Sequence, residues 1–233
     1  MRQDIEGIVL GFKDVFARPK SGIWSIPEDF EALLDSINIL APPKEELRQA
    51  VQHASKILIL DHAQRNIRDE YAIFTKYYLE VAKILGIYTQ TLELIEVLAK
   101  RQVYTDTNYS FFKDASEEIP VFARSGMKLC ILSNNWPSLK DRIFRLGLNP
   151  YIQTLIISSM EACCKPDPEL CITATNRMKL PADRILFVDC NPANLKAAEE
   201  AGMKVVLMNR SGKKPASPCM SVSSLTELRE KLL

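Results

Sequence analysis

The stretch ILFVDCNPANLKAAEEAGM, residues 185–203, decides the fold of this chain. It opens with four apolar residues, a pattern typical of a strand that is buried on both faces of a sheet. A polar loop follows, and residues 193–201 predict an amphipathic helix that Gly202 ends. Asp189 stands where strand gives way to loop, and Asn194 is placed to hold that loop down. A carboxylate at this position is costly unless it is paired or bound to a metal, so Asp189 is a candidate functional residue.

The same alternation of strand and helix extends over the second half of the chain. Apolar runs predict strands and amphipathic segments predict helices between them. We expect strands at residues 128–132, 154–157, 185–188, 204–208 and 220–222, and helices at residues 111–124, 139–146, 168–178, 193–201 and 225–232. Residues 212–218 form a predicted surface loop. Short apolar strands that alternate with helices indicate an α/β fold with a doubly wound parallel sheet covered on both faces.

The first half of the chain has a different character. Residues 8–16 predict a buried strand that runs into a loop, whereas residues 27–100 are helical in pattern, with proline and glycine at the breaks. This block forms a predicted α-helical cap domain, residues 18–103, inserted after the first strand. The α/β core domain then consists of residues 1–17 and 104–233.

Charge and hydropathy exclude several classes of partner. Lys and Arg total 30 and Asp and Glu total 29, with no basic stripe, so neither nucleic acid nor an anionic membrane is an expected partner. No stretch approaches the roughly 20 apolar residues of a membrane span. The acidic start at residues 1–6 has no signal-peptide pattern. We therefore expect a cytoplasmic protein.

The cysteines predict neither a disulfide nor a zinc site. No C-x-x-C pair occurs, and the two histidines, His53 and His62, lie far from every cysteine in the sequence. Cys130 lies inside an apolar strand and is most simply a small hydrophobic core residue. Reduced thiols are expected throughout. The cysteines are Cys130, Cys163, Cys164, Cys171, Cys190 and Cys219.

Two further polar groups follow predicted strands, where doubly wound sheets bind ligands. The Ser133 hydroxyl, with the amides of Asn134 and Asn135, could bind a phosphate oxygen, or it could simply begin a turn and cap the next helix. Lys165 opens the segment KPDP, in which two prolines restrict the entry to a helix. Alternatively, Lys165 is an ordinary solvated lysine.

Taken in this order and spacing, these segments resemble the haloacid dehalogenase superfamily, and within it the subfamily with an inserted helical cap, sugar-phosphate phosphatases included. Residues 9–13, 131–134, 165–168 and 185–203 match its four motifs, and the resemblance covers essentially the whole chain. It implies a phosphatase-like hydrolase in which two acids of the first motif act as nucleophile and as general acid and base. It also implies a Mg²⁺ ion held by acids of the first and fourth motifs.

Transferred to this chain, the resemblance assigns Ser133 and Lys165 to phosphate and Asp189 to the metal. From their positions beside these residues, Asn134 is predicted to bind phosphate through its backbone amide and Asn194 to support the loop. The sequence departs from the family at the positions that do the chemistry. Gly11 stands at the nucleophile position and Lys13 at the acid–base position.

Glycine has no nucleophile, so no catalytic set is intact. Cys190 replaces a frequent second metal acid, and Mg²⁺ usually needs one or two carboxylates, so we expect no cofactor and at most a weak Mg²⁺ site at Asp189. Asp14, three residues past the required position, and Cys190, without a predicted base, are poor replacement nucleophiles.

Lys13 suggests a replacement for the metal. Its ammonium could pair with Asp189, or it could point into solvent. The leading hypothesis is a pseudoenzyme that still binds a phosphorylated or other anionic ligand through Ser133 and Lys165. The alternatives are an active hydrolase with an unorthodox nucleophile and a non-catalytic interaction module, while no particular protein partner is indicated. In each case the strands ending at Phe12, Leu132 and Val188 should be neighbours.

Overall fold

The structure, a computed structural model, describes residues 4–212 and 219–233. Residues 213–218 of the predicted surface loop, and the first three residues of the chain, lie outside the described residues. The chain forms two compact units, one of residues 1–17 with 111–233 and one of residues 18–110. The second division follows Ser110, whereas the sequence placed it between residues 103 and 104. The difference arises because a short strand, Tyr109–Phe111, pairs with Ala17–Pro19 on the outgoing chain.

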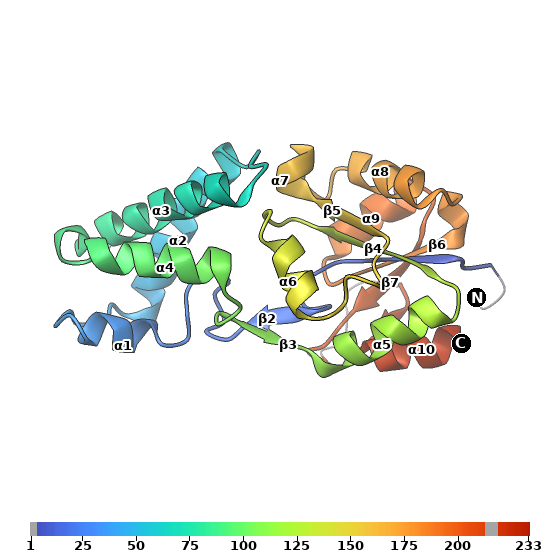
Figure 1. Cartoon of the computed structure of the whole chain (residues 1–233), viewed down its shortest axis with the longest axis horizontal. Helices are drawn as coiled ribbons and strands as arrows, with labels where there is room; N and C mark the ends of the chain where they lie inside the picture. The colour runs from blue at the N-terminus through green and yellow to red at the C-terminus, as the bar shows by residue number, and fades with distance from the viewer. Residues whose placement is uncertain (1–3, 213–218) are drawn as a thin grey trace. The chain divides into compact units, whose positions relative to one another are not determined.

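A six-stranded parallel sheet forms the centre of the larger unit (Figure 1). Its order is β5-β4-β1-β6-β7-β8, so the chain builds outward from β1 first in one direction and then in the other. This confirms the doubly wound α/β fold, and it makes β1 and its two neighbours the place where such sheets bind ligands. The strands are β1 (Gly7–Leu10), β4 (Lys128–Ser133), β5 (Thr154–Ile157), β6 (Ile185–Asp189), β7 (Lys204–Met208) and β8 (Ser221–Val222).

Helices cover both faces of this sheet (Figure 1). On one face, α8 (Glu169–Met178) and α9 (Pro192–Glu200) bury a core cluster that includes Val9, Cys130 and Phe187. On the other face lie α5 (Lys113–Arg124) and α10 (Leu225–Leu232). Successive side chains of a strand point to opposite faces, so strands covered in this way must be apolar throughout, as the sequence pattern indicated.

Three short elements were missed by the sequence pattern. Strands β2 (Ala17–Pro19) and β3 (Tyr109–Phe111) pair with each other, so the helix predicted from residue 111 starts at Lys113 instead. Residues 158–161 form a helical turn, α7 (Ser158–Glu161), directly after β5. Each element has only three or four residues, too few to establish a hydrophobic period. The larger unit also contains α6 (Leu139–Arg145) and the 3₁₀ turn η2 (Ala182–Arg184).

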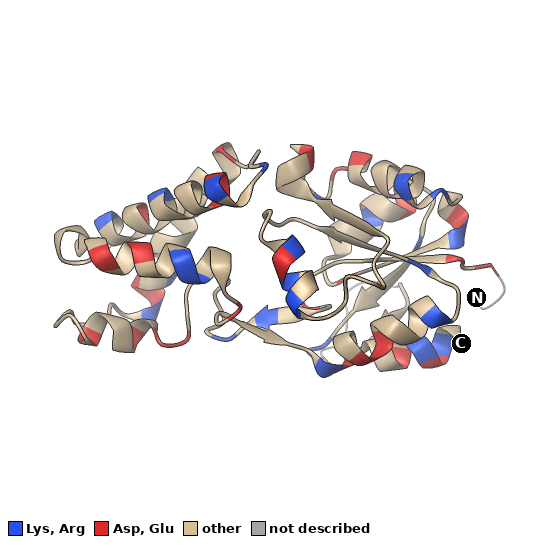
Figure 2. Cartoon of the chain, in the orientation of Figure 1, with Lys and Arg blue, Asp and Glu red and all other residues tan. Residues whose placement is uncertain are grey.

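The unit of residues 18–110 is helical, as predicted. Asn66 caps α3, since its side-chain oxygen accepts hydrogen bonds from the amides of Arg68 and Asp69, each at 3.0 Å. The two charge signs are intermixed over the helices of each unit, in keeping with the near-zero net charge (Figure 2). In the described part of the chain no helix is long and apolar enough to cross a membrane. The helices are α1 (Phe30–Asp35), α2 (Lys44–Leu60), α3 (Ile67–Ile84), η1 (Tyr88–Gln90) and α4 (Leu92–Tyr104).

Candidate functional site

The candidate site lies at the carboxyl ends of β4, β1 and β6. These strands are neighbours in register, with Leu10 of β1 opposite Ile131 of β4 and Val188 of β6. The prediction that these three strands are neighbours is therefore confirmed, although β1 ends at Leu10 and not at Phe12. The Gly11 amide continues the ladder by donating to the Val188 carbonyl at 2.8 Å. The residue after β1 and the last residue of β6, Asp189, are thus brought side by side.

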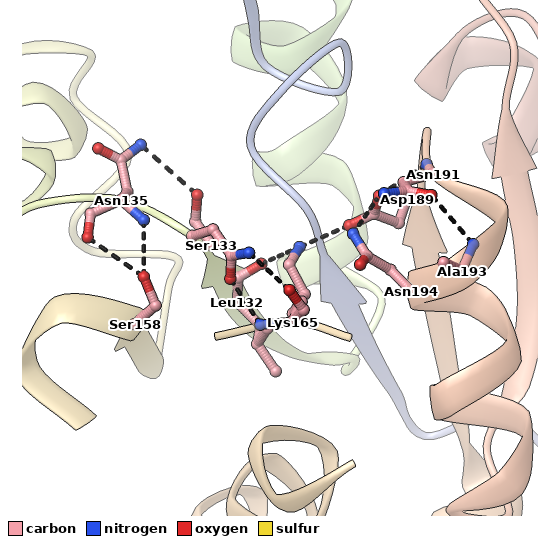
Figure 3. Close-up of polar contacts among 10 residues, drawn as sticks. Leu132, Ser133, Asn135, Ser158, Lys165, Asp189, Asn191, Ala193 and Asn194 are labelled. Atoms are coloured by element: carbon pink, nitrogen blue, oxygen red, sulfur yellow. Dashed lines mark hydrogen bonds and ion pairs between the residues drawn. The ribbon is translucent and has the colours of Figure 1, made fainter. Parts of the chain in front are cut away.

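Asp189 is almost fully buried, and both of its carboxylate oxygens accept hydrogen bonds (Figure 3). Oδ2 accepts from the Lys165 ammonium at 2.5 Å. Oδ1 accepts from the Asn191 amide at 2.9 Å and from Asn194 Nδ2 at 3.0 Å. The charge is therefore compensated by one cation and the remaining oxygen by two neutral donors, which is what a buried carboxylate requires.

Lys165 is a buried lysine, not a solvated one. Its side chain is 6% exposed. Besides its bond to Asp189, the ammonium donates to the Leu132 carbonyl at 2.9 Å and lies 5.5 Å from the centre of the Phe187 ring. An ammonium has three N–H donors, and two of them are used by these hydrogen bonds.

The hypothesis that Lys13 neutralises Asp189 is wrong. Lys13 is exposed, and among the described residues no ion pair joins it to Asp189. Lys13 lies in the turn after β1, whereas Lys165 reaches the carboxylate from the loop before α8. The second of the two alternatives for Lys13 therefore holds, and the cation at Asp189 comes from the third motif.

Asn134 holds the Lys165 backbone. Its Oδ1 accepts from the Lys165 amide at 2.7 Å, and its Nδ2 donates to the Lys165 carbonyl at 2.8 Å. The Asn134 side chain is thus occupied in fixing the peptide from which the buried ammonium extends, whereas the group predicted to bind phosphate was its backbone amide. No signal in the sequence distinguishes this clamp from a ligand contact, because its partner lies 31 residues away.

Ser133 keeps a hydroxyl donor at the edge of the site (Figure 3). Its Oγ lies 3.5 Å from Asn135 Nδ2, which donates to it, so its own O–H is not used by this contact. Ser158, which sequence reasoning missed, fixes the loop below. Its Oγ accepts from the Asn135 amide at 3.0 Å and donates to the Asn135 carbonyl at 3.4 Å.

Gly11 is also a packing requirement. A Cβ atom at this position would lie 2.5 Å from Asp189 Oδ2 and 3.0 Å from Asp189 Cγ. Neither atom is the free end of a flexible side chain, because the carboxylate is held by three donors. The space that a nucleophilic side chain needs at its root is therefore occupied by Asp189.

These residues do not fit a Mg²⁺ ion. Mg²⁺ takes oxygen ligands in near-octahedral geometry, usually including one or two carboxylates. Asp189 is the buried carboxylate at this edge, and its oxygens already accept hydrogen bonds from Lys165, Asn191 and Asn194. Within residues 4–212 and 219–233, no group of three or more His, Cys, Asp or Glu side chains could hold a metal. The donor set is that of an internal ion pair.

Cys190 is a poor nucleophile in this setting. Burial, together with the negative charges of Asp189 and Asp14, raises the pKa of its thiol to about 11, while Lys13 and Lys165 act in the opposite direction. At neutral pH the group is therefore a thiol and not the reactive thiolate.

Comparison with known proteins gives the family. The family model described as haloacid dehalogenase-like hydrolase matches residues 30–208, most of the chain, and the chain belongs to this family. The match includes Ser133, Lys165 and Asp189 but begins after Gly11 and Lys13.

Similar proteins include both phosphatases and dehalogenases. Enolase-phosphatase E1 of Aquifex aeolicus is 25% identical over 79% of this chain and 81% of its own. (S)-2-haloacid dehalogenase 4A of Burkholderia cepacia is 27% identical over 70% and 73%. Among solved structures, a Bacillus subtilis HAD-hydrolase bound to magnesium superposes with a TM-score of 0.71 at 18% identity, covering 99% of each chain. That likeness supports the fold.

Removal of the buried Lys165 ammonium should strongly destabilise the fold. We expect Lys165→Ala to lower the free energy of unfolding by roughly 3–5 kcal/mol, because it leaves Asp189 buried and unpaired. The matched control is Lys13→Ala, an exposed lysine, for which the change should stay within about 0.5 kcal/mol. Urea unfolding of both variants measures the difference. Equal stabilities would show that the buried pair is not a major contributor.

Gly11→Ala tests the steric conflict with Asp189. We expect a loss of about 1–3 kcal/mol in unfolding free energy, the usual cost of overpacking a well-filled site. Gly7→Ala is the control at the start of β1: its Cβ would meet Leu180 Cδ1 and Met178 Cε at 2.6 Å, flexible ends that can move, and the Lys128 carbonyl oxygen at 3.3 Å. If Gly11→Ala lowers the free energy of unfolding no more than Gly7→Ala does, the proposed steric conflict between position 11 and Asp189 is wrong.

Proposed function

We propose that this chain is a non-catalytic member of the haloacid dehalogenase-like hydrolase family, a pseudoenzyme that binds a small phosphorylated or other anionic ligand. The observation that carries the proposal is the packing at position 11. Gly11 offers no nucleophile, and the space where a side chain would begin is taken by the Asp189 carboxylate. The expected chemistry needs a nucleophile and a metal ion. Position 11 has no nucleophilic side chain, and the carboxylate that would bind the metal is already hydrogen-bonded.

Ser133 and Lys165 support the binding part of the proposal. The Ser133 hydroxyl and the third N–H of the Lys165 ammonium are donors at the carboxyl edge of the sheet, where doubly wound folds bind ligands. Because Asp189 compensates the Lys165 charge, attraction for an anion is short-ranged and the expected affinity is low. Relatives named as phosphatases and as a haloacid dehalogenase favour an anion as the ligand.

Replacement nucleophiles find little support. Cys190 carries its proton at neutral pH, since the pKa of its thiol is raised to about 11 by burial and by nearby carboxylates. Asp14 lies three residues beyond Gly11, in a turn where its own φ is 52° and its amide donates to the Ala17 carbonyl. An active hydrolase with an unorthodox nucleophile is therefore the weaker hypothesis.

With phosphomonoesters and Mg²⁺, and with 2-haloacids, turnover should be indistinguishable from a control without protein. The missing nucleophile leaves reactions whose uncatalysed rates are extremely slow. Phosphate and halide release measure the two activities. A rate that is lost in Asp189→Asn and in Cys190→Ala would overturn the proposal, whereas a rate unaffected by both variants would come from a contaminating enzyme.

Binding of inorganic phosphate tests the ligand site. We expect weak binding by calorimetry or by NMR shifts, reduced roughly 3- to 10-fold in Ser133→Ala, since one hydrogen bond contributes about 1 kcal/mol. Ser116→Ala, an exposed serine on α5, is the matched control and should bind as the parent does. Added Mg²⁺ should leave the affinity unchanged. A strong Mg²⁺ dependence, or equal binding by Ser133→Ala, would count against the site as described.

A further inference from the structure

Arg210 follows β7 and makes an unusually complete set of contacts within the α/β core. Its Nε donates to the Asp14 carbonyl at 2.9 Å, and its Nη2 donates to the Val15 carbonyl at 2.8 Å. Nη2 also pairs with the Asp114 carboxylate at 3.0 Å. The guanidinium lies 3.8 Å from the centre of the Phe112 ring. The side chain is 14% exposed, so these bonds are partly shielded from water.

The carbonyls on one side of Arg210 belong to the chain that leaves the core. Residues 12–17 form a tight turn between β1 and β2, in which the Phe12 carbonyl accepts from the Phe16 amide at 2.9 Å. Asp14 holds a left-handed conformation there, with φ of 52°, which is uncommon for a residue with a side chain. The bond from Arg210 to the Asp14 carbonyl helps hold this peptide in place.

The groups on the other side belong to the chain that returns to the core. Phe112 and Asp114 come directly after β3, and the Phe112 amide donates to the Phe16 carbonyl at 2.9 Å. Asp114 extends the network, since its Oδ2 accepts from the Leu225 amide at 2.7 Å, at the start of α10. One side chain therefore joins the outgoing turn, the returning segment and, through Asp114, a core helix.

We propose that Arg210 is the anchor that fixes both connections to the inserted helical unit at their core ends. Its planar guanidinium can donate to two carbonyls and a carboxylate at once while its face stacks on a ring, a combination that an ammonium cannot reproduce. Without these bonds the turn at residues 12–17 and the segment at residues 109–114 open together, while the parallel sheet keeps its pairing. One core residue, Arg210, thus limits local opening of the backbone at both connections.

Hydrogen exchange on the full chain tests the proposal. In Arg210→Lys and Arg210→Met we expect exchange of peptides covering residues 12–17 and 109–114 to rise about tenfold or more, because charge-assisted hydrogen bonds that limit local opening are lost. Peptides from β4 and β6 should exchange as in the parent. The control is Arg177→Lys on α8, which removes a bidentate ion pair with Glu161 of α7 and should leave both connections unchanged.

Phe112→Leu provides a second, milder variant that keeps every hydrogen bond of Arg210 and removes only the ring beneath it. A smaller increase in exchange, in the same two segments, would support the anchor and would decide the matter even if Arg210→Met failed to fold. Unchanged exchange at residues 12–17 in Arg210→Lys would overturn the proposal. An equal increase over the whole core would also overturn it, because Arg210 would then contribute only to global stability.

Discussion

The buried ion pair between Lys165 and Asp189 is the interaction on which the rest of the site depends. Neither side chain is more than 6% exposed, so both charges have been removed from water, and each would be strongly unfavourable alone. The pair is tolerated because both carboxylate oxygens and two of the three ammonium protons have hydrogen-bond partners. The Leu132 carbonyl accepts a hydrogen bond from a second N–H of the ammonium. Asn191 and Asn194 donate to the other carboxylate oxygen.

This pair has a consequence for the neighbouring strand. The Asp189 carboxylate lies where the Cβ atom of a residue at position 11 would be. Glycine, which has no Cβ, is therefore the residue that fits there. The lack of a side chain at position 11 and the internal neutralisation of Asp189 are thus two aspects of one arrangement. A tethered ammonium also differs from a metal ion, because it carries one charge and offers no open coordination position to a substrate oxygen.

The sequence predicted the fold well because residues 185–203 combine a strand, a turn and a helix whose signals agree. It also placed Ser133, Lys165 and Asp189 at one edge of the sheet, because each follows a predicted strand. It could not identify the cation that pairs with Asp189. Lys13 belongs to the first motif, but Lys165 is the cation that reaches Asp189, because of the path of the loop before α8, which a pattern of residues does not encode. The connecting strands β2 and β3 were not predicted, because three residues are too few to show an alternating hydrophobic pattern.

An acid added at position 11 would not by itself complete a site of the kind that the family resemblance implies. An aspartate at position 11 would bring a second carboxylate against Asp189, in contact at its Cβ and unfavourable in charge, while Lys165 can compensate only one of the two. Asp189 would have to release the Lys165 ammonium or move, and its bonds to Asn191 and Asn194 resist that movement. A metal ion could offset the added charge only after such a rearrangement, so each change is unfavourable until the other has occurred. Coupling of this kind keeps the site in its present form.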